Sequence, residues 1–155
     1  MQFRILLFSS LLTISSLLTA CGEGQQVSET APEPEPVMLE GTSWQLVRIN
    51  ALGGYEFVPE DSSDYILRFR AQSRLVAESD CNTAGATWTQ DGGTLTLEQF
   101  VTTNNMCPPG TLHNHFVSNL RNVDAFSNAG NNLVFTTSIP GVTMEFEQRG
   151  TSSSQ

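Results

Sequence analysis

The residues of this chain best suited to chemistry are its three cysteines and two histidines. Cys107 lies shortly before His113 and His115, and sulfur and imidazole ligands together favour soft metal ions. Residues two positions apart on a helix do not face one another, however. We therefore interpret both histidines as surface residues at the start of a helix. A metal- or redox-linked site that uses His113, His115 and Cys107 is the alternative.

Cys21 follows a segment with the layout of a secretory signal peptide. Residues 1–4 carry a positive charge, residues 5–18 form an apolar run, and small residues precede the cysteine. The run is shorter than the roughly 20 residues of a membrane-spanning helix, so we expect residues 1–20 to be cleaved. Leu18-Thr19-Ala20-Cys21 resembles a bacterial lipobox. The resemblance implies that Cys21 becomes the N-terminus and carries diacylglycerol on its sulfur.

The lipobox resemblance also implies a location. Each buried CH2 contributes about 0.8 kcal/mol, so two or three acyl chains anchor a protein firmly to a membrane. Gly22 is not the aspartate that retains many enterobacterial lipoproteins at the inner membrane. We expect a lipid-anchored protein of the cell envelope, at the outer membrane and facing the periplasm. The covalent lipid on Cys21 is the only cofactor-like group expected.

Cys81 and Cys107 are left once Cys21 is acylated. Export brings them into an oxidising compartment, where two thiols form a disulfide by default. In the chain-entropy model a loop of this length stabilises by about 3.5 kcal/mol. That is a large share of the roughly 5–15 kcal/mol typical of a domain. A metal pair and a catalytic thiol are the rival interpretations.

The charge balance argues against some partners. Seven basic residues, all of them arginine, face 16 acidic ones, giving a net charge of −9 before the loss of Arg4 with the signal peptide. An acidic surface repels phosphate groups. We therefore expect no nucleic-acid partner and no binding to anionic headgroups.

Composition divides the chain into four parts. After the signal peptide of residues 1–20, residues 21–37 are acidic and proline-rich and contain too few apolar side chains to fold. We expect them to form a flexible tether. Residues 38–148 form one domain, and residues 149–155 form a Ser-rich, disordered tail.

Hydrophobic periodicity predicts mostly strands in the domain. The expected strands span residues 43–49, 65–70, 75–79, 86–90, 94–98, 133–137 and 142–147. Leu112, Phe116 and Leu120 recur every four residues, which predicts an amphipathic helix over residues 111–123 with Thr111 as its cap. The fold is therefore mainly β: a small antiparallel, lipocalin-like barrel or strongly bent sheet, with one α-helix between the middle and C-terminal strands.

The aromatic residues form two groups. Those at inward positions of the expected elements are assigned to the core: Trp44, Phe69, Trp88, Phe116, Phe135 and Phe146. Tyr55, Phe57 and Phe100 lie in loop-like stretches, and exposed aromatic residues tend to mark interfaces. These three are the candidate binding residues.

Carboxylates gather between Glu56 and Asp64. A pair of them could act in glycoside hydrolysis. Residues 60–64 could also bind calcium, although they lack the glycine and terminal glutamate of an EF-hand loop. Catalysis by a serine would depend on His113 or His115 as base, and no G-x-S-x-G motif is present. We interpret the acidic loop as solvated, and expect no catalytic and no metal-binding residues.

Several short motifs, in their order, resemble the META domain family, which includes HslJ-like heat-shock lipoproteins. Residues 39–46 are similar to its opening L-x-G-T-x-W-x-L. Asp80-Cys81-Asn82 resembles its G-C-N turn, and residues 91–95 resemble its D-G-x-x-L hairpin. Thr103 and Cys107 match the ends of T-x-M-x-C. The resemblance covers residues 39–147.

The resemblance implies a small lipocalin-like barrel and no known reaction. We therefore expect a membrane-anchored, non-enzymatic binding or stress-tolerance module. Its partner would be an envelope protein or a small apolar ligand at the barrel mouth. A purely structural lipoprotein is a further alternative.

Overall fold

The computed structural model describes residues 37–150, and we number its elements along the chain. The predicted signal peptide, Cys21, the tether up to Pro36 and residues 151–155 of the tail lie outside the described residues. The elements are β1 (Ser43–Asn50), η1 (Leu52–Gly54), β2 (Glu56–Phe57), η2 (Ser62–Asp64), β3 (Ile66–Arg70), β4 (Arg74–Glu78), β5 (Thr83–Asp91), β6 (Thr94–Thr102), α1 (His113–Leu120), β7 (Val123–Ala129), β8 (Asn132–Thr137) and β9 (Thr143–Gln148).

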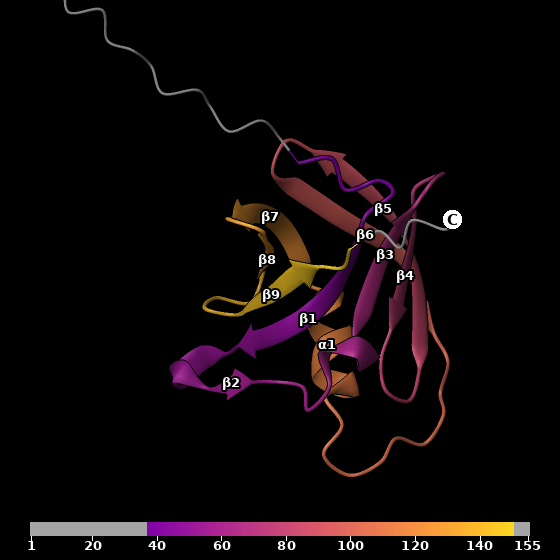
Figure 1. Cartoon of the computed structure of the whole chain (residues 1–155), viewed down its shortest axis with the longest axis vertical. Helices are drawn as coiled ribbons and strands as arrows, with labels where there is room; N and C mark the ends of the chain where they lie inside the picture. The colour runs from indigo at the N-terminus through magenta and orange to yellow at the C-terminus, as the bar shows by residue number, and fades with distance from the viewer. Residues whose placement is uncertain (1–36, 151–155) are drawn as a thin grey trace, which may run out of the picture. The chain divides into compact units, whose positions relative to one another are not determined.

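The strands form a closed antiparallel barrel (Figure 1). Neighbours along the sheet follow the order β1-β3-β4-β5-β6-β7-β8-β9, and β1 pairs with β9 to close it. The extra strand β2 pairs with the C-terminal part of β1, where Ile49 is opposite Phe57. The structure thus confirms the mainly β prediction and selects the barrel over the bent sheet.

Strand register defines two ends of the barrel. At the N-terminal end Trp44 of β1 is paired with Gln148 of β9, and at the helix end Asn50 is paired with Thr143. Because the strands are antiparallel, the loop between β4 and β5 and the loop between β6 and α1 both emerge at the helix end. The chain segments that carry the cysteines and histidines therefore meet at one end.

Helix α1 closes the barrel where β6 and β7 separate. These two strands are paired at a single position, Thr94 with Ala125. Phe116 and Leu120 of the helix are fully buried, and the Phe116 ring lies 5.4 Å from the ring of Tyr65. The helix is therefore a part of the core that fixes the loops around it.

Side chains fill the interior of the barrel. The six aromatic residues assigned to the core are all buried, which confirms that prediction: Trp44, Phe69, Trp88, Phe116, Phe135 and Phe146. Edge-to-face packing of Phe69 on Trp88, with ring centroids 5.2 Å apart, extends this core towards the N-terminal end. There the buried Leu39 caps the core, and the Gln90 side chain donates to Val37 O at 2.6 Å.

The helix and several strands differ from the sequence-based expectation, and β6 continues to Thr102 rather than ending at residue 98. The helix begins at His113 and ends at Leu120 rather than spanning 111–123, and Leu112 is its N-cap. Residues 123–129 form strand β7, which was not predicted because its buried residues, Val123 and Phe126, do not alternate and most of the segment is exposed. Strand β2 was also not predicted, because two residues are too few to show an alternating pattern of apolar and polar side chains.

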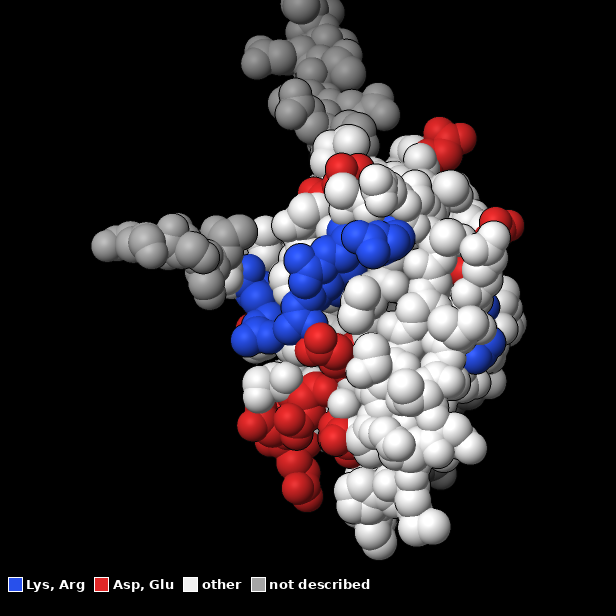
Figure 2. Space-filling view, turned by 90° about the vertical axis from the view of Figure 1, so that its right-hand side faces the viewer, with Lys and Arg blue, Asp and Glu red and all other residues white. Residues whose placement is uncertain are grey.

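The described surface carries its charges in groups. Figure 2 shows a band of blue side chains across the middle of one face, with a group of carboxylates below it and separate charged side chains at the top and right. Strands β3 and β4 bring Arg70 and Arg74 into register, and Arg68 forms an ion pair with Glu78. Within residues 37–150, no helix is both long and apolar enough to cross a membrane.

Candidate functional site

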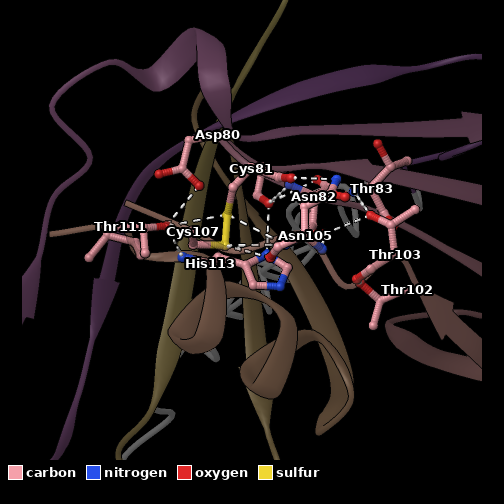
Figure 3. Close-up of a disulfide and its surroundings, with 12 residues drawn as sticks. Asp80, Cys81, Asn82, Thr83, Thr102, Thr103, Asn105, Cys107, Thr111 and His113 are labelled. Carbon is pink, nitrogen blue, oxygen red and sulfur yellow. Dashed lines mark hydrogen bonds between the residues drawn. A yellow bond between two sulfur atoms is a disulfide. The ribbon is translucent and has the colours of Figure 1, made fainter. Parts of the chain in front are cut away.

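The predicted disulfide between Cys81 and Cys107 is present at the helix end (Figure 3). Cys81 lies in the turn between β4 and β5, and Cys107 lies in the loop that leads from β6 to α1. Their Cα atoms are 5.3 Å apart and their separation in sequence is 26 residues. The bond therefore ties the loop before the helix to the turn that leads into the neighbouring strand β5.

We use the name disulfide cluster for the groups around this bond. Its members are Ser79, Cys81, Asn82, Cys107, Thr111 and His113. They come from two segments that are far apart in sequence, residues 79–82 and residues 107–113. Only the two cysteines were identified from the sequence as a structural pair.

Asn82 is the buried polar centre of the disulfide cluster. Its Oδ1 accepts hydrogen bonds from Asn105 N at 2.7 Å and from Thr103 Oγ1 at 2.8 Å. Its Nδ2 donates to Asn105 O at 3.1 Å and also lies 3.1 Å from Cys107 Sγ. One side chain thus binds the loop before Cys107 at three points. The sequence presented Asn82 only as part of a motif, because its partners lie more than twenty positions away.

His113 does not lie on the surface, so that interpretation is wrong for His113, whereas His115 is exposed as expected. It is 8% exposed, and its Nδ1 lies 2.7 Å from Ser79 Oγ. Ser79 Oγ is also within hydrogen-bonding distance of the Asn82 backbone. His113 is therefore turned inwards against the turn that carries Cys81.

Cys81, Cys107 and His113 could together hold a metal ion. One potential ligand atom from each lies within 4.8 Å of the other two. While the sulfurs are joined, neither is a thiolate, which is the form that binds metal. In the oxidised protein the disulfide cluster thus holds the loop before α1 by one covalent bond and by hydrogen bonds.

Thr111 and Tyr65 attach the start of the helix to the barrel. Thr111 Oγ1 donates to Asp80 Oδ1 at 2.8 Å and accepts from His113 N at 3.0 Å. Tyr65 OH accepts from Leu112 N at 2.8 Å. Burial of the phenol raises the pKa of Tyr65, since the low-dielectric surroundings disfavour the phenolate.

His115 faces away from the disulfide cluster and contacts a candidate binding residue. Its ring stacks on that of Phe57, with centroids 4.2 Å apart. Phe57 is half-buried by this contact, whereas Tyr55, in the same segment, is 71% exposed. Of the two histidines named in the metal-site alternative, the structure brings only His113 to the sulfurs.

The third candidate binding residue lies elsewhere. Phe100 is in strand β6 and not in a loop, which corrects the expectation. The guanidinium of Arg121, just after the helix, lies 4.5 Å from the centre of its ring. Phe57 and Phe100 therefore contact opposite ends of α1, and Phe100 is separate from the segment that carries Tyr55.

The acidic loop is partly used by the fold. Glu56 forms an ion pair with Arg48 at 2.6 Å, and Asp61 Oδ1 accepts a hydrogen bond from Ser63 N at 2.8 Å. Hydrogen bonds from the side chain and backbone of Ser63 lower the pKa of Asp61. These carboxylates therefore have structural partners. Four acidic side chains also line a surface pocket of about 350 Å³: Glu60, Asp61, Asp64 and Asp80.

Two kinds of comparison place the chain among known proteins. Its fold is similar to the NMR structure of a protein from Burkholderia xenovorans (TM-score 0.61, 17% identity, 81% of this chain and 98% of the other). It is also similar to the crystal structure of a duf4847 family protein from Bacteroides vulgatus (TM-score 0.55, 14% identity, 71% of this chain and 94% of the other). The chain has no match among the curated proteins searched. The model of the META domain matches residues 37–151, and the chain therefore belongs to the META domain family.

Proposed function

We propose that this protein is a lipid-anchored, non-enzymatic envelope protein that binds a partner protein and contributes to stress tolerance. The sequence Leu18-Thr19-Ala20-Cys21 supports the anchor. The disulfide supports export, because such bonds persist in oxidising compartments. The outer membrane, facing the periplasm, is the location that Gly22 favours.

The binding surface is proposed from exposed apolar side chains. Leu52, Tyr55 and Val58, which we name the Tyr55 surface, are 60%, 71% and 59% exposed. They lie in the connection between β1 and β3 at the helix end of the barrel. Large exposed apolar side chains tend to mark interaction sites, and tyrosine is frequent among residues that dominate binding. This grouping is the observation that carries the proposal.

The position of Phe57 prepares this surface for binding. Its stacking on His115 and the pairing of β2 with β1 fix the segment without covering Tyr55. A fixed segment loses less conformational entropy when a partner binds. The carboxylates of Glu60 and Asp61 follow directly in the chain, so a partner with basic residues around an apolar centre would be complementary.

The filled interior favours a surface partner over a small apolar ligand. Phe69, Phe135 and Phe146 occupy the barrel centre and have no exposed area. A ligand inside the barrel would have to displace them, which would open a well-packed core. Recognition from outside needs no such change.

Site-specific photo-crosslinking of the full acylated protein in its own envelope tests the proposal. A photoreactive phenylalanine at Tyr55 should give one dominant protein adduct, and Tyr55→Ala should weaken capture of that same protein. The same probe at Ser127, an exposed residue of β7, is the control. Equal adducts at both positions, or none at Tyr55, would favour the purely structural alternative.

The lipid anchor is tested separately. Wild-type protein should incorporate labelled palmitate and sediment with membranes. Cys21→Ser should do neither and should retain the precursor segment. Incorporation of label by Cys21→Ser would refute acylation at this sulfur.

A further inference from the structure

We propose that reduction of the Cys81–Cys107 bond converts the disulfide cluster into a binding site for a thiophilic metal ion. Cys81, Cys107 and His113 would be the ligands, and Zn²⁺ is the ion that we consider. The structure is the oxidised state, in which the bond between the sulfurs blocks the site. Binding would therefore depend on a reductant.

The distances fit a tetrahedral site. With Zn–S bonds of about 2.3 Å and Zn–N bonds of about 2.0–2.1 Å, two sulfurs lie about 3.8 Å apart and sulfur and nitrogen about 3.6 Å apart. The ligand atoms of Cys81, Cys107 and His113 already lie within 4.8 Å of one another. Rotation of the two cysteine side chains would separate the sulfurs without a change of the barrel.

Asn82 would keep the site assembled after reduction. Its hydrogen bonds to Asn105 and Thr103 fix the loop before Cys107 independently of the disulfide. Its Nδ2 group also lies 3.1 Å from Cys107 Sγ and 3.5 Å from Cys81 Sγ. An N–H group directed at a sulfur stabilises the thiolate, because hydrogen bonds to a charged form favour it. The same side chain thus positions the loop and prepares both ligands.

His113 is oriented by the barrel. Ser79 Oγ, 2.7 Å from Nδ1, fixes the buried ring beside the sulfurs. A hydrogen bond to one ring nitrogen orients an imidazole that binds metal through the other, so Nε2 of His113 would be the ligand. The fourth position would be open to water or to Asp80, an exposed carboxylate next to Cys81.

The redox step balances with a dithiol as reductant. A thiolate of the dithiol attacks one sulfur of the half-buried bond, which forms a mixed disulfide and releases the other cysteine. The second thiol of the dithiol resolves the mixed disulfide. Two electrons and two protons pass to Cys81 and Cys107, and the dithiol becomes a disulfide. Zn²⁺ then displaces the two thiol protons.

The test uses the full chain, oxidised or reduced with a phosphine that is removed before metal is added. Co²⁺ serves as a spectroscopic substitute for Zn²⁺. Reduced wild-type protein should bind one equivalent with thiolate-to-cobalt charge-transfer bands and strong tetrahedral ligand-field bands, and oxidised protein should show neither. Zn²⁺ should displace the cobalt and should raise the Tm of the reduced protein only.

Matched histidine variants identify the nitrogen ligand. His113→Gln should weaken the affinity of the reduced protein for Co²⁺ at least about tenfold, whereas His115→Gln should leave it unchanged. Circular dichroism of each oxidised variant checks the fold. If His113→Gln does not fold, NMR of the wild-type rings replaces it: Zn²⁺ should shift the ring signals of His113 and leave those of His115 in place.

Three results would overturn the proposal. The first is a reduced wild-type protein that binds no Co²⁺. The second is equal binding by His113→Gln and wild type. The third is a reduced protein that unfolds and that Zn²⁺ does not refold, because Asn82 would then fail to keep the ligands together.

Discussion

Asn82→Ala should destabilise the oxidised protein by on the order of 3 kcal/mol. The substitution removes three hydrogen bonds to nitrogen and oxygen partners, with distances of 2.7, 2.8 and 3.1 Å. Each contributes about 1 kcal/mol to the free energy of unfolding. The groups that lose their hydrogen bond to Asn82 and gain no bond to water add to this loss of stability. The disulfide stays intact, so its contribution does not change.

Urea unfolding followed by tryptophan fluorescence measures this effect, since both Trp44 and Trp88 are buried. Asn104→Ala is the control, because Asn104 is an exposed neighbour on the same loop, and we expect a change within about 0.5 kcal/mol. A loss below about 1 kcal/mol for Asn82→Ala, or one equal to that of the control, would refute the assignment of Asn82 as the fixing point of the loop. In reduced Asn82→Ala protein the loss of the free energy of unfolding should exceed the sum of the losses caused separately by reduction and by the substitution, because both the disulfide and the Asn82 hydrogen bonds would then be absent.

The remaining predictions concern stability. Replacing Cys81 and Cys107 together by alanine should lower the free energy of unfolding by about 3.5 kcal/mol in the same urea assay, and an unchanged midpoint would contradict the structural role of the bond. Phe116→Ala should cost about 3–5 kcal/mol, measured by thermal unfolding, and a loss below 1 kcal/mol would show that α1 is not part of the core. Tyr65→Phe leaves Leu112 N without its acceptor and should cost about 1–3 kcal/mol. Because burial raises the pKa of Tyr65, wild-type stability should be fully present below the unfolded-state value of about 10 and fall above it. The difference in the free energy of unfolding between wild type and Tyr65→Phe should therefore become smaller in alkaline solution. A difference that does not depend on pH would contradict this.

Strand prediction succeeded where one face of the strand is buried. In β3 the buried Leu67 and Phe69 alternate with the more exposed Arg68 and Arg70, so the sequence alone identifies the buried face of the strand. Strand β7 gives no such signal, since pairing with β8 rather than burial fixes most of it. Helix α1 was predicted too long for a related reason. Val123 continues the apolar spacing of the helix but belongs to the next strand.

The site was less accessible to sequence reasoning than the fold. Export and the number of cysteines were enough to predict the disulfide. The roles of Asn82 and His113 depend on loops brought together only by barrel closure, and no local period encodes that. The residue at which the helix begins decides which histidine points inwards. The predicted start, two residues too early, gave no indication of this.

The direction in which β1 runs along the barrel separates the entry of the chain from the candidate site. The described chain enters the barrel at the end where Trp44 is paired with Gln148. The sulfurs and Tyr55 lie at the other end, beyond the last residues of β4 and β1. A protein or dithiol that binds there therefore does not contact the segment through which the chain enters the domain.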